Sequence, residues 1–209
     1  MQPIVCMISE PVDPDRFESL VARVADFARA GVHLVQIRQR TLDGGPLLML
    51  VRQCVAALAS TRTRLVVNDR LDVALAGGAH GVHLRADSMP ASRVRAIAPR
   101  GFLIGRSVHA ASEAHAAELD GGVDYLVFGT IFTTSSKPGR PAAGIATLNA
   151  VCAATTLPVL AVGGVTTGTV AEVARSGASG IAAISLFAEG TDAQAVLLAV
   201  RDSWRSSGC

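Results

Sequence analysis

The stretch Arg64-Leu-Val-Val-Asn-Asp-Arg-Leu-Asp-Val-Ala-Leu-Ala-Gly-Gly-Ala-His-Gly-Val-His-Leu84 contains one complete strand–helix–strand unit. The apolar run Arg64–Val67 predicts a buried strand, Asp69–Ala76 a short helix and Gly81–Leu84 the next strand. Two parallel strands that follow each other in a sheet need a crossover between them, and a helix usually forms it. This unit therefore predicts a parallel sheet covered by helices.

The same alternation of β-branched runs and Ala-rich segments continues along all 209 residues. We expect the other strands near Ile4–Ile8, His33–Arg38, Phe102–Ile104, Tyr125–Phe128, Val159–Val162 and Gly180–Ile184. We expect the other helices near Asp15–Ala30, Gly45–Ser60, Ala91–Ala98, Ser112–Asp120, Ile145–Ala154, Thr167–Ser176 and Asp192–Trp204. Eight strands alternating with eight helices predict one α/β domain over residues 1–209, a (β/α)8 TIM barrel, ahead of an open doubly wound sheet.

The composition excludes several other classes of protein. The formal net charge of +2 is too small to predict binding to nucleic acid or to a membrane surface. The four cysteines are scattered without a Cys-x-x-Cys pair, so we expect reduced thiols and neither disulfides nor a zinc site. No apolar run is long enough to span a membrane and no signal peptide is visible, so we expect a cytoplasmic protein.

In a barrel of this kind, chemistry belongs at the carboxyl ends of the strands. Alternation along the second strand directs Gln36 and Arg38 into the barrel mouth, with Arg40 on the same side. The polar residues that we expect to join them from other strand ends are Asn68, Ser107 and Lys137. Several cations that converge on one volume need an anion to be tolerated. The alternative is that they form surface ion pairs with Asp43, Asp69 or Asp87.

Lys137 is the only lysine among the nineteen lysines and arginines of the chain. It follows four hydroxyl residues, Thr133 to Ser136, and precedes Pro-Gly. A compact ammonium surrounded by short hydrogen-bond donors is typical of a phosphate or pyrophosphate site. The alternative is a solvated loop residue.

A second phosphate site is predicted at the last two strands. The turn Gly163-Gly164 follows the seventh strand and Ser185 follows the eighth, which is where many TIM barrels bind a phosphate through backbone N–H groups. Three other polar residues at strand ends each have two interpretations. Asp69 is either a Mg²⁺ ligand or a helix N-cap, and His83 and His109 are either bases or hydrogen-bonded structural residues.

Seven motifs occur in order along the chain and carry a family resemblance. They are Val35-Gln-Ile-Arg-Gln-Arg40, Val67-Asn-Asp-Arg-Leu-Asp-Val-Ala-Leu75, Gly81-Val-His-Leu84, Ser107-Val-His109, Asp124-Tyr-Leu-Val-Phe-Gly-Thr-Ile-Phe-Thr-Thr-Ser-Ser-Lys137, Val162-Gly-Gly-Val165 and Ser179-Gly-Ile-Ala-Ala-Ile-Ser185. Together they resemble the thiamin phosphate synthase/TenI superfamily over nearly the whole chain. The resemblance implies a TIM barrel. It also implies small-molecule phosphate substrates.

The resemblance also implies the roles of individual residues. In the synthase, hydroxymethylpyrimidine pyrophosphate loses pyrophosphate and the nitrogen of thiazole phosphate captures the pyrimidine. The residues that would hold the pyrimidine and the pyrophosphate are Gln36, Arg38, Arg40, Asn68, Ser107 and Lys137, with Arg38, Ser107 and Lys137 expected to take part in catalysis. Those that would hold the thiazole phosphate and its neighbouring groups are Gly163, Gly164, Ile184, Ser185, Thr134 and Ser136. Asp69 would bind Mg²⁺ in a synthase, and otherwise no cofactor is expected. A homodimer is an expected assembly of a barrel of this size.

The chain departs from both branches of this superfamily. The synthase usually carries an Asp as second Mg²⁺ ligand where this chain has Ser88, unless Asp87 replaces it. Ser88 and the segment Gly139-Arg-Pro-Ala-Ala-Gly144 resemble TenI, a thiazole tautomerase, but the usual TenI histidine is replaced by Thr130. We favour the TenI-like branch, which binds or tautomerises a thiazole phosphate. The alternatives are thiamin phosphate synthase and a non-catalytic thiazole phosphate-binding regulator.

Overall fold

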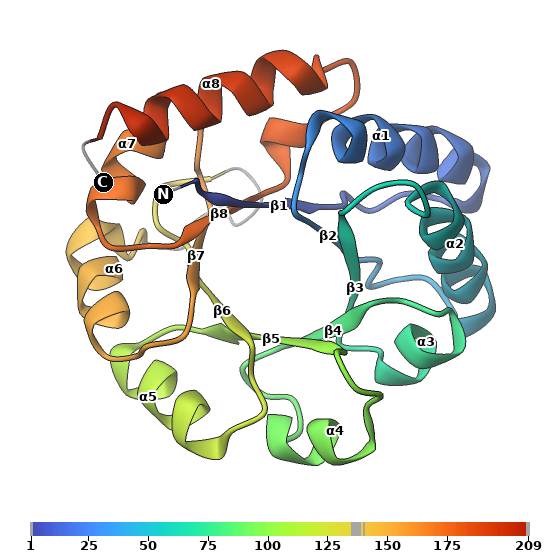
Figure 1. Cartoon of the computed structure of the whole chain (residues 1–209), viewed down its shortest axis with the longest axis horizontal. Helices are drawn as coiled ribbons and strands as arrows, with labels where there is room; N and C mark the ends of the chain where they lie inside the picture. The colour runs from blue at the N-terminus through green and yellow to red at the C-terminus, as the bar shows by residue number, and fades with distance from the viewer. Residues whose placement is uncertain (1, 135–138, 140, 208–209) are drawn as a thin grey trace.

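The computed structural model describes residues 2–134, 139 and 141–207 and has a ring of parallel strands surrounded by helices (Figure 1). The strands are β1 (Ile4–Ile8), β2 (Leu34–Ile37), β3 (Arg64–Asn68), β4 (Gly81–Leu84), β5 (Leu103–Val108), β6 (Tyr125–Gly129), β7 (Val159–Val162) and β8 (Gly180–Ala183). The helices are α1 (Phe17–Ala30), α2 (Gly44–Ala57), α3 (Leu71–Ala76), α4 (Ala91–Ile97), α5 (Ala111–Asp120), α6 (Gly144–Ala153), α7 (Val170–Arg175) and α8 (Ala193–Arg205). Two 3₁₀ turns, η1 (Pro14–Arg16) and η2 (Ser185–Phe187), complete the described elements.

The eight described strands form a closed ring. Each strand pairs in parallel with the next, and β1 also pairs with β8, so that Cys6 lies opposite Leu34 on one side and Ala182 on the other. The barrel leaves no open sheet edge and confirms the predicted (β/α)8 fold.

Two apolar layers follow from the alternation of side chains along the strands. Residues directed outward pack under the helices and form the larger core, which includes Val35, Val67 and Ile104. Residues directed inward, such as Cys6, Leu34 and others from the remaining strands, fill the interior of the barrel. Toward the carboxyl ends of the strands the inward positions become polar, and this change creates the site.

Two predictions about local structure were wrong. β5 was expected to end at Ile104 but continues to Val108, because Arg106 and Ser107 stay in register with Leu126 and Val127 of β6. A polar residue does not end a strand whose inner face lines a polar mouth. Asp69 does not cap α3, since the N-cap is Arg70 and the backbone of Asp69 is left-handed (φ 59°).

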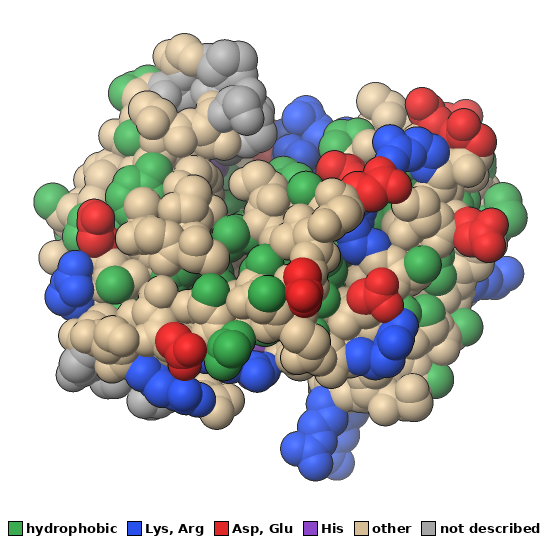
Figure 2. Space-filling model, turned by 90° about the horizontal axis from the view of Figure 1, so that it is seen from above, with side chains coloured by type: hydrophobic (Ala, Val, Ile, Leu, Met, Phe, Trp, Pro, Cys, Tyr) green, Lys and Arg blue, Asp and Glu red, His purple; other side chains and the backbone are tan. Residues whose placement is uncertain are grey.

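The outer surface carries mixed charges. Figure 2 shows acidic and basic side chains interspersed on one face of the molecule, with apolar side chains scattered between them. Among the described residues, no helix is both long enough and apolar enough to cross a membrane.

Candidate active site

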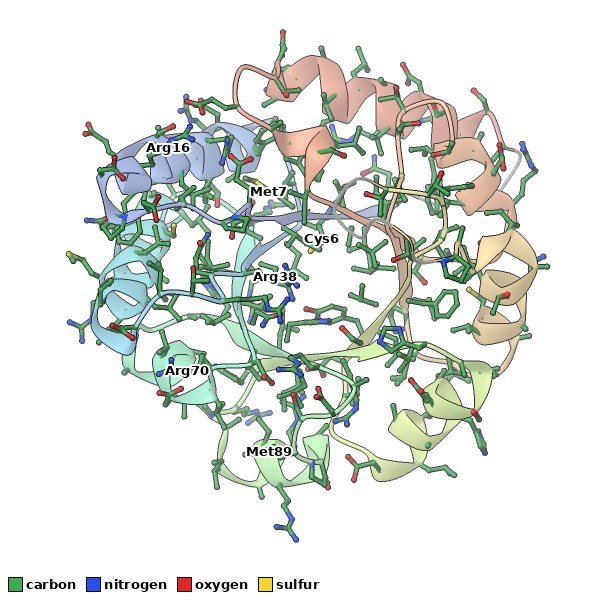
Figure 3. The ribbon with its side chains drawn as sticks, turned by 180° about the vertical axis from the view of Figure 1, so that it is seen from behind. Cys6, Met7, Arg16, Arg38, Arg70 and Met89 are labelled. Carbon is green, nitrogen blue, oxygen red and sulfur yellow. The ribbon has the colours of Figure 1, made fainter. Side chains whose placement is uncertain are left out.

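Arg38 directly follows β2, and its side chain points into the middle of the ring of strands (Figure 3). Gln36, two residues earlier on the same face, is only 4% exposed. Burial lowers the pKa of Arg38, and the positive charges of Arg40 and Arg85 lower it further. No carboxylate in the described part of the chain forms an ion pair with Arg38 or Arg40. The three guanidinium groups therefore create a positive field at the mouth that an anion would relieve.

The end of β2 is held in place by residues that the sequence analysis did not select. The backbone N–H of Arg38 donates to Oγ of the buried Ser9, at 2.9 Å, and the N–H of Ser9 donates to the carbonyl of Gln36, also at 2.9 Å. Gln39 is buried against the segment after β1, where its Oε1 accepts from the N–H of Val12 and its Nε2 donates to Ser9. These bonds fix the direction in which Arg38 leaves the strand. The signal that could have revealed them is a polar residue close to the end of each of two consecutive strands, Ser9 and Gln39.

His83 of β4 joins two hydroxyl groups inside the barrel. Its Nε2 lies 2.9 Å from Oγ of Ser107 on β5, and its Nδ1 lies 3.2 Å from the hydroxyl of Tyr125 on β6. Burial, and then the positive charge of Arg38, lower the pKa of His83 to about 3. The imidazole is therefore neutral at physiological pH and holds Ser107 in place, which is the structural interpretation of this histidine.

A glycine makes this arrangement possible. A Cβ atom on Gly105, between Arg106 and Ile104 on β5, would lie 2.2 Å from Cζ of Tyr125 and 2.5 Å from Nδ1 of His83. Any larger residue would therefore push apart the two rings that support Ser107.

Asp69 lies beside the mouth, where β3 ends after Asn68. The Oγ of Ser88 donates to Oδ1 of Asp69, and a guanidinium nitrogen of Arg85 lies 3.7 Å from Oδ2. The other terminal nitrogen of Arg85 is 2.5 Å from Oδ2 of Asp87, and the N–H of Arg85 donates to Ser88 at 2.9 Å. These residues line a cavity of about 240 Å³. The ion pairs expected as an alternative thus form at Arg85, and not at Arg38 or Arg40.

The donor set of this cavity does not fit a Mg²⁺ ion. A hard divalent cation needs several oxygen ligands that carry negative charge. Here both carboxylate oxygens of Asp69 already face Ser88 or Arg85, and Asp87 is paired with Arg85. Within the described ranges, no group of three His, Cys, Asp or Glu side chains could hold a metal ion. The guanidinium of Arg85 already supplies positive charge beside Asp69 and Asp87.

The turn after β7 packs on the chain segment that follows β6. Gly163 and Gly164 both have positive φ angles (98° and 66°). A Cβ atom on Gly163 would lie 2.6 Å from Cγ2 of Thr130, and one on Gly164 would lie 2.5 Å from the carbonyl of Thr133. The N–H of Phe132 donates to the carbonyl of Gly163. Only glycine fits at these two positions, so the turn packs closely on the segment between Thr130 and Thr133.

The neighbouring strand β8 brings the other residues of the predicted thiazole phosphate site to the same side of the mouth. Ile184 follows β8 and packs on the inner core, and the exposed Ser185 opens η2. Thr134 is half-buried in the segment after β6. Ser136 and Lys137, which were also predicted for the site, lie outside the described residues.

A family comparison decides the identity of this barrel. The model of the family described as thiamine monophosphate synthase matches residues 5–187. The chain belongs to the thiamine monophosphate synthase family. The predicted superfamily is thereby confirmed, and the family is one of thiamin-biosynthetic enzymes.

Individual relatives agree with this assignment. The thiamine-phosphate synthase of Methanoculleus marisnigri is 38% identical over 92% of this chain and 90% of its own length. The thiamine-phosphate synthase of Methanoregula boonei is 44% identical over 78% of this chain and 76% of its own. A putative thiamine-phosphate synthase 2 of Aquifex aeolicus is 36% identical over 82% and 91%.

Solved structures show the same fold. The thiamine phosphate pyrophosphorylase of Pyrococcus furiosus superposes with a TM-score of 0.81 at 28% identity, covering 97% of this chain and 96% of that one. A 3-hexulose-6-phosphate synthase reaches 0.70 at 15% identity over 97% and 99%, which is a likeness of the fold alone.

Proposed function

We propose that this protein is a thiamin phosphate synthase, which joins the pyrimidine of hydroxymethylpyrimidine pyrophosphate to the ring nitrogen of thiazole phosphate. The observation that carries the proposal is the field of Arg38, Arg40 and Arg85 at the mouth, two of them without a carboxylate partner among the described residues. The names of the relatives support the same activity. We prefer this function to the TenI-like branch favoured by the sequence. A synthase must bind a pyrophosphate, whereas a TenI-like protein binds a single phosphate. Three arginines at the mouth suit the more highly charged pyrophosphate.

The reaction requires stabilisation of the negative charge on the leaving pyrophosphate and positioning of the two substrates. The bond between the pyrimidine methylene carbon and the pyrophosphate oxygen breaks, and its electron pair leaves with the pyrophosphate. The lone pair of the thiazole nitrogen then forms the new carbon–nitrogen bond. Arg38 and Arg40 stabilise the negative charge that develops on the leaving group, because their guanidinium groups stand at the mouth before the reaction begins. Lys137 would be a third cationic donor to the oxygens of the pyrophosphate.

The pyrimidine is held by the neutral polar residues of the site. Gln36, buried at the floor of the mouth, offers both a donor and an acceptor to the ring and its amino group. Asn68 lies at the end of β3 and Ser107 near the end of β5, on either side of β4, and His83 of β4 fixes the hydroxyl of Ser107. The thiazole phosphate is held by Gly163, Gly164 and Ser185 on the β7–β8 side. The two substrates thereby meet across the mouth with the reacting atoms oriented.

The test is formation of thiamin phosphate from the two substrates by purified protein. We expect product with the wild-type chain and a loss of kcat of about a hundredfold or more in Arg38→Met, the scale seen when one donor to a developing anion is removed. The matched control is Arg62→Met, because Arg62 is an exposed arginine before β3, at the opposite end of the barrel. Absence of product with active reference enzyme in the same buffer would contradict the proposal.

A thiazole tautomerase is the second candidate, and one contact favours it. Nδ1 of His109 lies 3.1 Å from the carbonyl of Gly129, next to Thr130, the position at which TenI carries its histidine. When Nδ1 donates to that carbonyl, Nε2 is left with a lone pair and becomes a candidate base. Incubation with the carboxylated thiazole phosphate tautomer tests this activity. Turnover that disappears in His109→Gln would support it, whereas binding without turnover would point to the non-catalytic regulator.

A further inference from the structure

Arg85 is the residue that distinguishes this mouth from one built around a metal ion. Its guanidinium lies between the two carboxylates of the β3–β4 side, 3.7 Å from Asp69 and 2.5 Å from Asp87. The Arg85 side chain is still 52% exposed, so a terminal N–H group remains available to a ligand in the cavity. A guanidinium carries five N–H donors in a planar fork, of which the described contacts occupy only some.

Arg85 also belongs to the positive field of the mouth. Its charge is close enough to Arg38 to disfavour the protonated form of that residue, as does the charge of Arg40. Arg85 is therefore paired with Asp69 and Asp87 and is also near enough to Arg38 for the two positive charges to repel each other. An anion bound at the mouth beside Arg85 and Arg38 would relieve this repulsion.

Asp69 has a clear role in this arrangement. Its left-handed backbone directs the carboxylate toward β4, where Ser88 donates to one oxygen and Arg85 faces the other. The Oγ of Ser88 also accepts from the backbone N–H of Arg85, so Ser88 connects Asp69 with the backbone of the β4–α4 loop. The carboxylates hold the guanidinium at the rim and leave no vacant set of oxygens for a divalent cation.

We propose that Arg85 replaces the metal ion of this site, so that Arg85, Arg38 and Arg40 bind the pyrophosphate group without Mg²⁺. The inference rests on the proposed function, since it concerns the leaving group of that reaction. Arginine recognises phosphate oxygens through two parallel N–H···O bonds, which supplies both charge and orientation. The Ser88 that interrupts the usual pair of carboxylates is then part of an arginine site and not a defect in a metal site.

The test is calorimetric titration of inorganic pyrophosphate alone into purified wild-type protein in the presence of EDTA. We expect binding under these conditions. In Arg85→Ala the affinity is expected to fall by about tenfold to a hundredfold, the range for removal of a charged hydrogen-bond donor. Arg100→Ala is the matched control, because Arg100 is an exposed arginine in the loop before β5, at the opposite end of the barrel, and its affinity should equal that of the wild type.

A second variant reverses the proposed replacement. Arg85→Ala combined with Ser88→Asp removes the guanidinium and restores a second carboxylate beside Asp69. We expect this double variant to bind pyrophosphate poorly in EDTA and to regain affinity when Mg²⁺ is added, while Arg85→Ala alone does not. Circular dichroism of each variant confirms that it is folded before the titrations are compared.

Three results would overturn the proposal. Wild-type protein that binds pyrophosphate with Mg²⁺ but not with EDTA contains a metal site, and unchanged affinity in Arg85→Ala means that Arg85 does not contact the anion. Formation of thiamin phosphate that requires Mg²⁺ would refute this inference while leaving the synthase intact. Metal-free pyrophosphate binding without any thiamin phosphate would support the arginine site while refuting the synthase.

Discussion

At the scale of single residues, Gly105 has the sharpest structural requirement in the site. In Gly105→Ala the new methyl group would meet Tyr125 and His83 at 2.2 to 2.5 Å, so both rings must move. We expect a loss of about 1–3 kcal/mol in the free energy of unfolding, the usual cost of overpacking. Urea denaturation followed by circular dichroism measures it.

Gly45→Ala is the matched control for that substitution. Gly45 lies in the first turn of α2, and apart from its chain neighbours and the adjoining helix backbone no atom lies within 4 Å of the position that its Cβ would take. The control should be as stable as the wild type or slightly more stable, since alanine reduces the entropy of the unfolded chain. Equal effects of the two substitutions would show that the close contact at Gly105 has no energetic consequence.

His83 links the stability of the protein to pH. Burial lowers its pKa from 6.5 to about 3, so below pH 6.5 the unfolded chain binds a proton that the folded chain does not. The free energy of unfolding should therefore be unaffected by this group above pH 6.5 and should decrease as the pH falls toward 3. The slope for one such group approaches about 1.4 kcal/mol per pH unit.

The slope of unfolding free energy against pH, compared between variants, measures this effect. His83→Asn removes the titrating group, and we expect a shallower slope than in the wild type between pH 6.5 and the acid limit of folding. His33 and His80 also have lowered pKa values caused mainly by burial, and they keep their share of the slope in both proteins. His115→Asn, at an exposed position on α5, should leave the wild-type slope unchanged; a slope unaffected by His83→Asn would contradict the assignment.

At the scale of secondary-structure elements, Arg95 bonds α4 to the segments that enter β5 and β6. Arg95 donates to the carbonyl groups of Phe102 at 2.6 Å and Gly122 at 2.9 Å, and pairs with Asp124 at 2.6 Å. Asp124 in turn accepts from the N–H of Ile104 on β5, at 2.7 Å. A single side chain thus connects α4 with the segments that enter β5 and β6.

Removal of this connection should destabilise the fold without changing the chemistry. We expect Arg95→Met to lower the free energy of unfolding by about 1–3 kcal/mol, because charged hydrogen bonds to backbone carbonyls are lost. Arg93→Met on the same helix is exposed and should change stability by less than about 0.5 kcal/mol. Chemical denaturation measures both variants. A loss of stability in Arg95→Met alone indicates the hydrogen bonds of Arg95, whereas equal losses would indicate that α4 needs only positive charge.

At the scale of the whole molecule, the single Trp204 reports on closure of the outer ring of helices. Trp204 is 3% exposed and lies on α8 with the buried residues Leu197 and Val200. α8 is also joined to the end of α1 through Arg201, which donates to the carbonyl of Gly31 at 3.2 Å. The first and last helices of the chain therefore lie side by side, as Figure 1 shows.

This closure predicts that the barrel unfolds as one unit. Trp204 fluorescence and far-ultraviolet circular dichroism should change at the same urea concentration, as expected of a cooperative transition in a single domain. A fluorescence transition that precedes the loss of helical signal would show that α8 detaches on its own. Leu198→Ala, an exposed position on the same helix, should leave the two transitions coincident and serves as the control.

The fold was largely readable from the sequence, because its signals are local. The spacing of apolar residues in short windows located each strand and helix to within a few residues, and alternation on β2 directed Gln36 and Arg38 inward. Ordered motifs across the chain then identified the superfamily. The wrong predictions, at β5 and at Asp69, concern places where polar residues line the mouth, so that local polarity no longer reports on secondary structure.

Contacts across the ring were decided only by the tertiary structure. His83 meets Ser107 and Tyr125, and Arg85 faces Asp69, because the closed barrel sets a register among strands that are far apart in sequence. Sequence alone showed which residue types stand at the strand ends, but it carries no information about which of them touch. That depends on shear and strand order, which follow from packing of the entire chain.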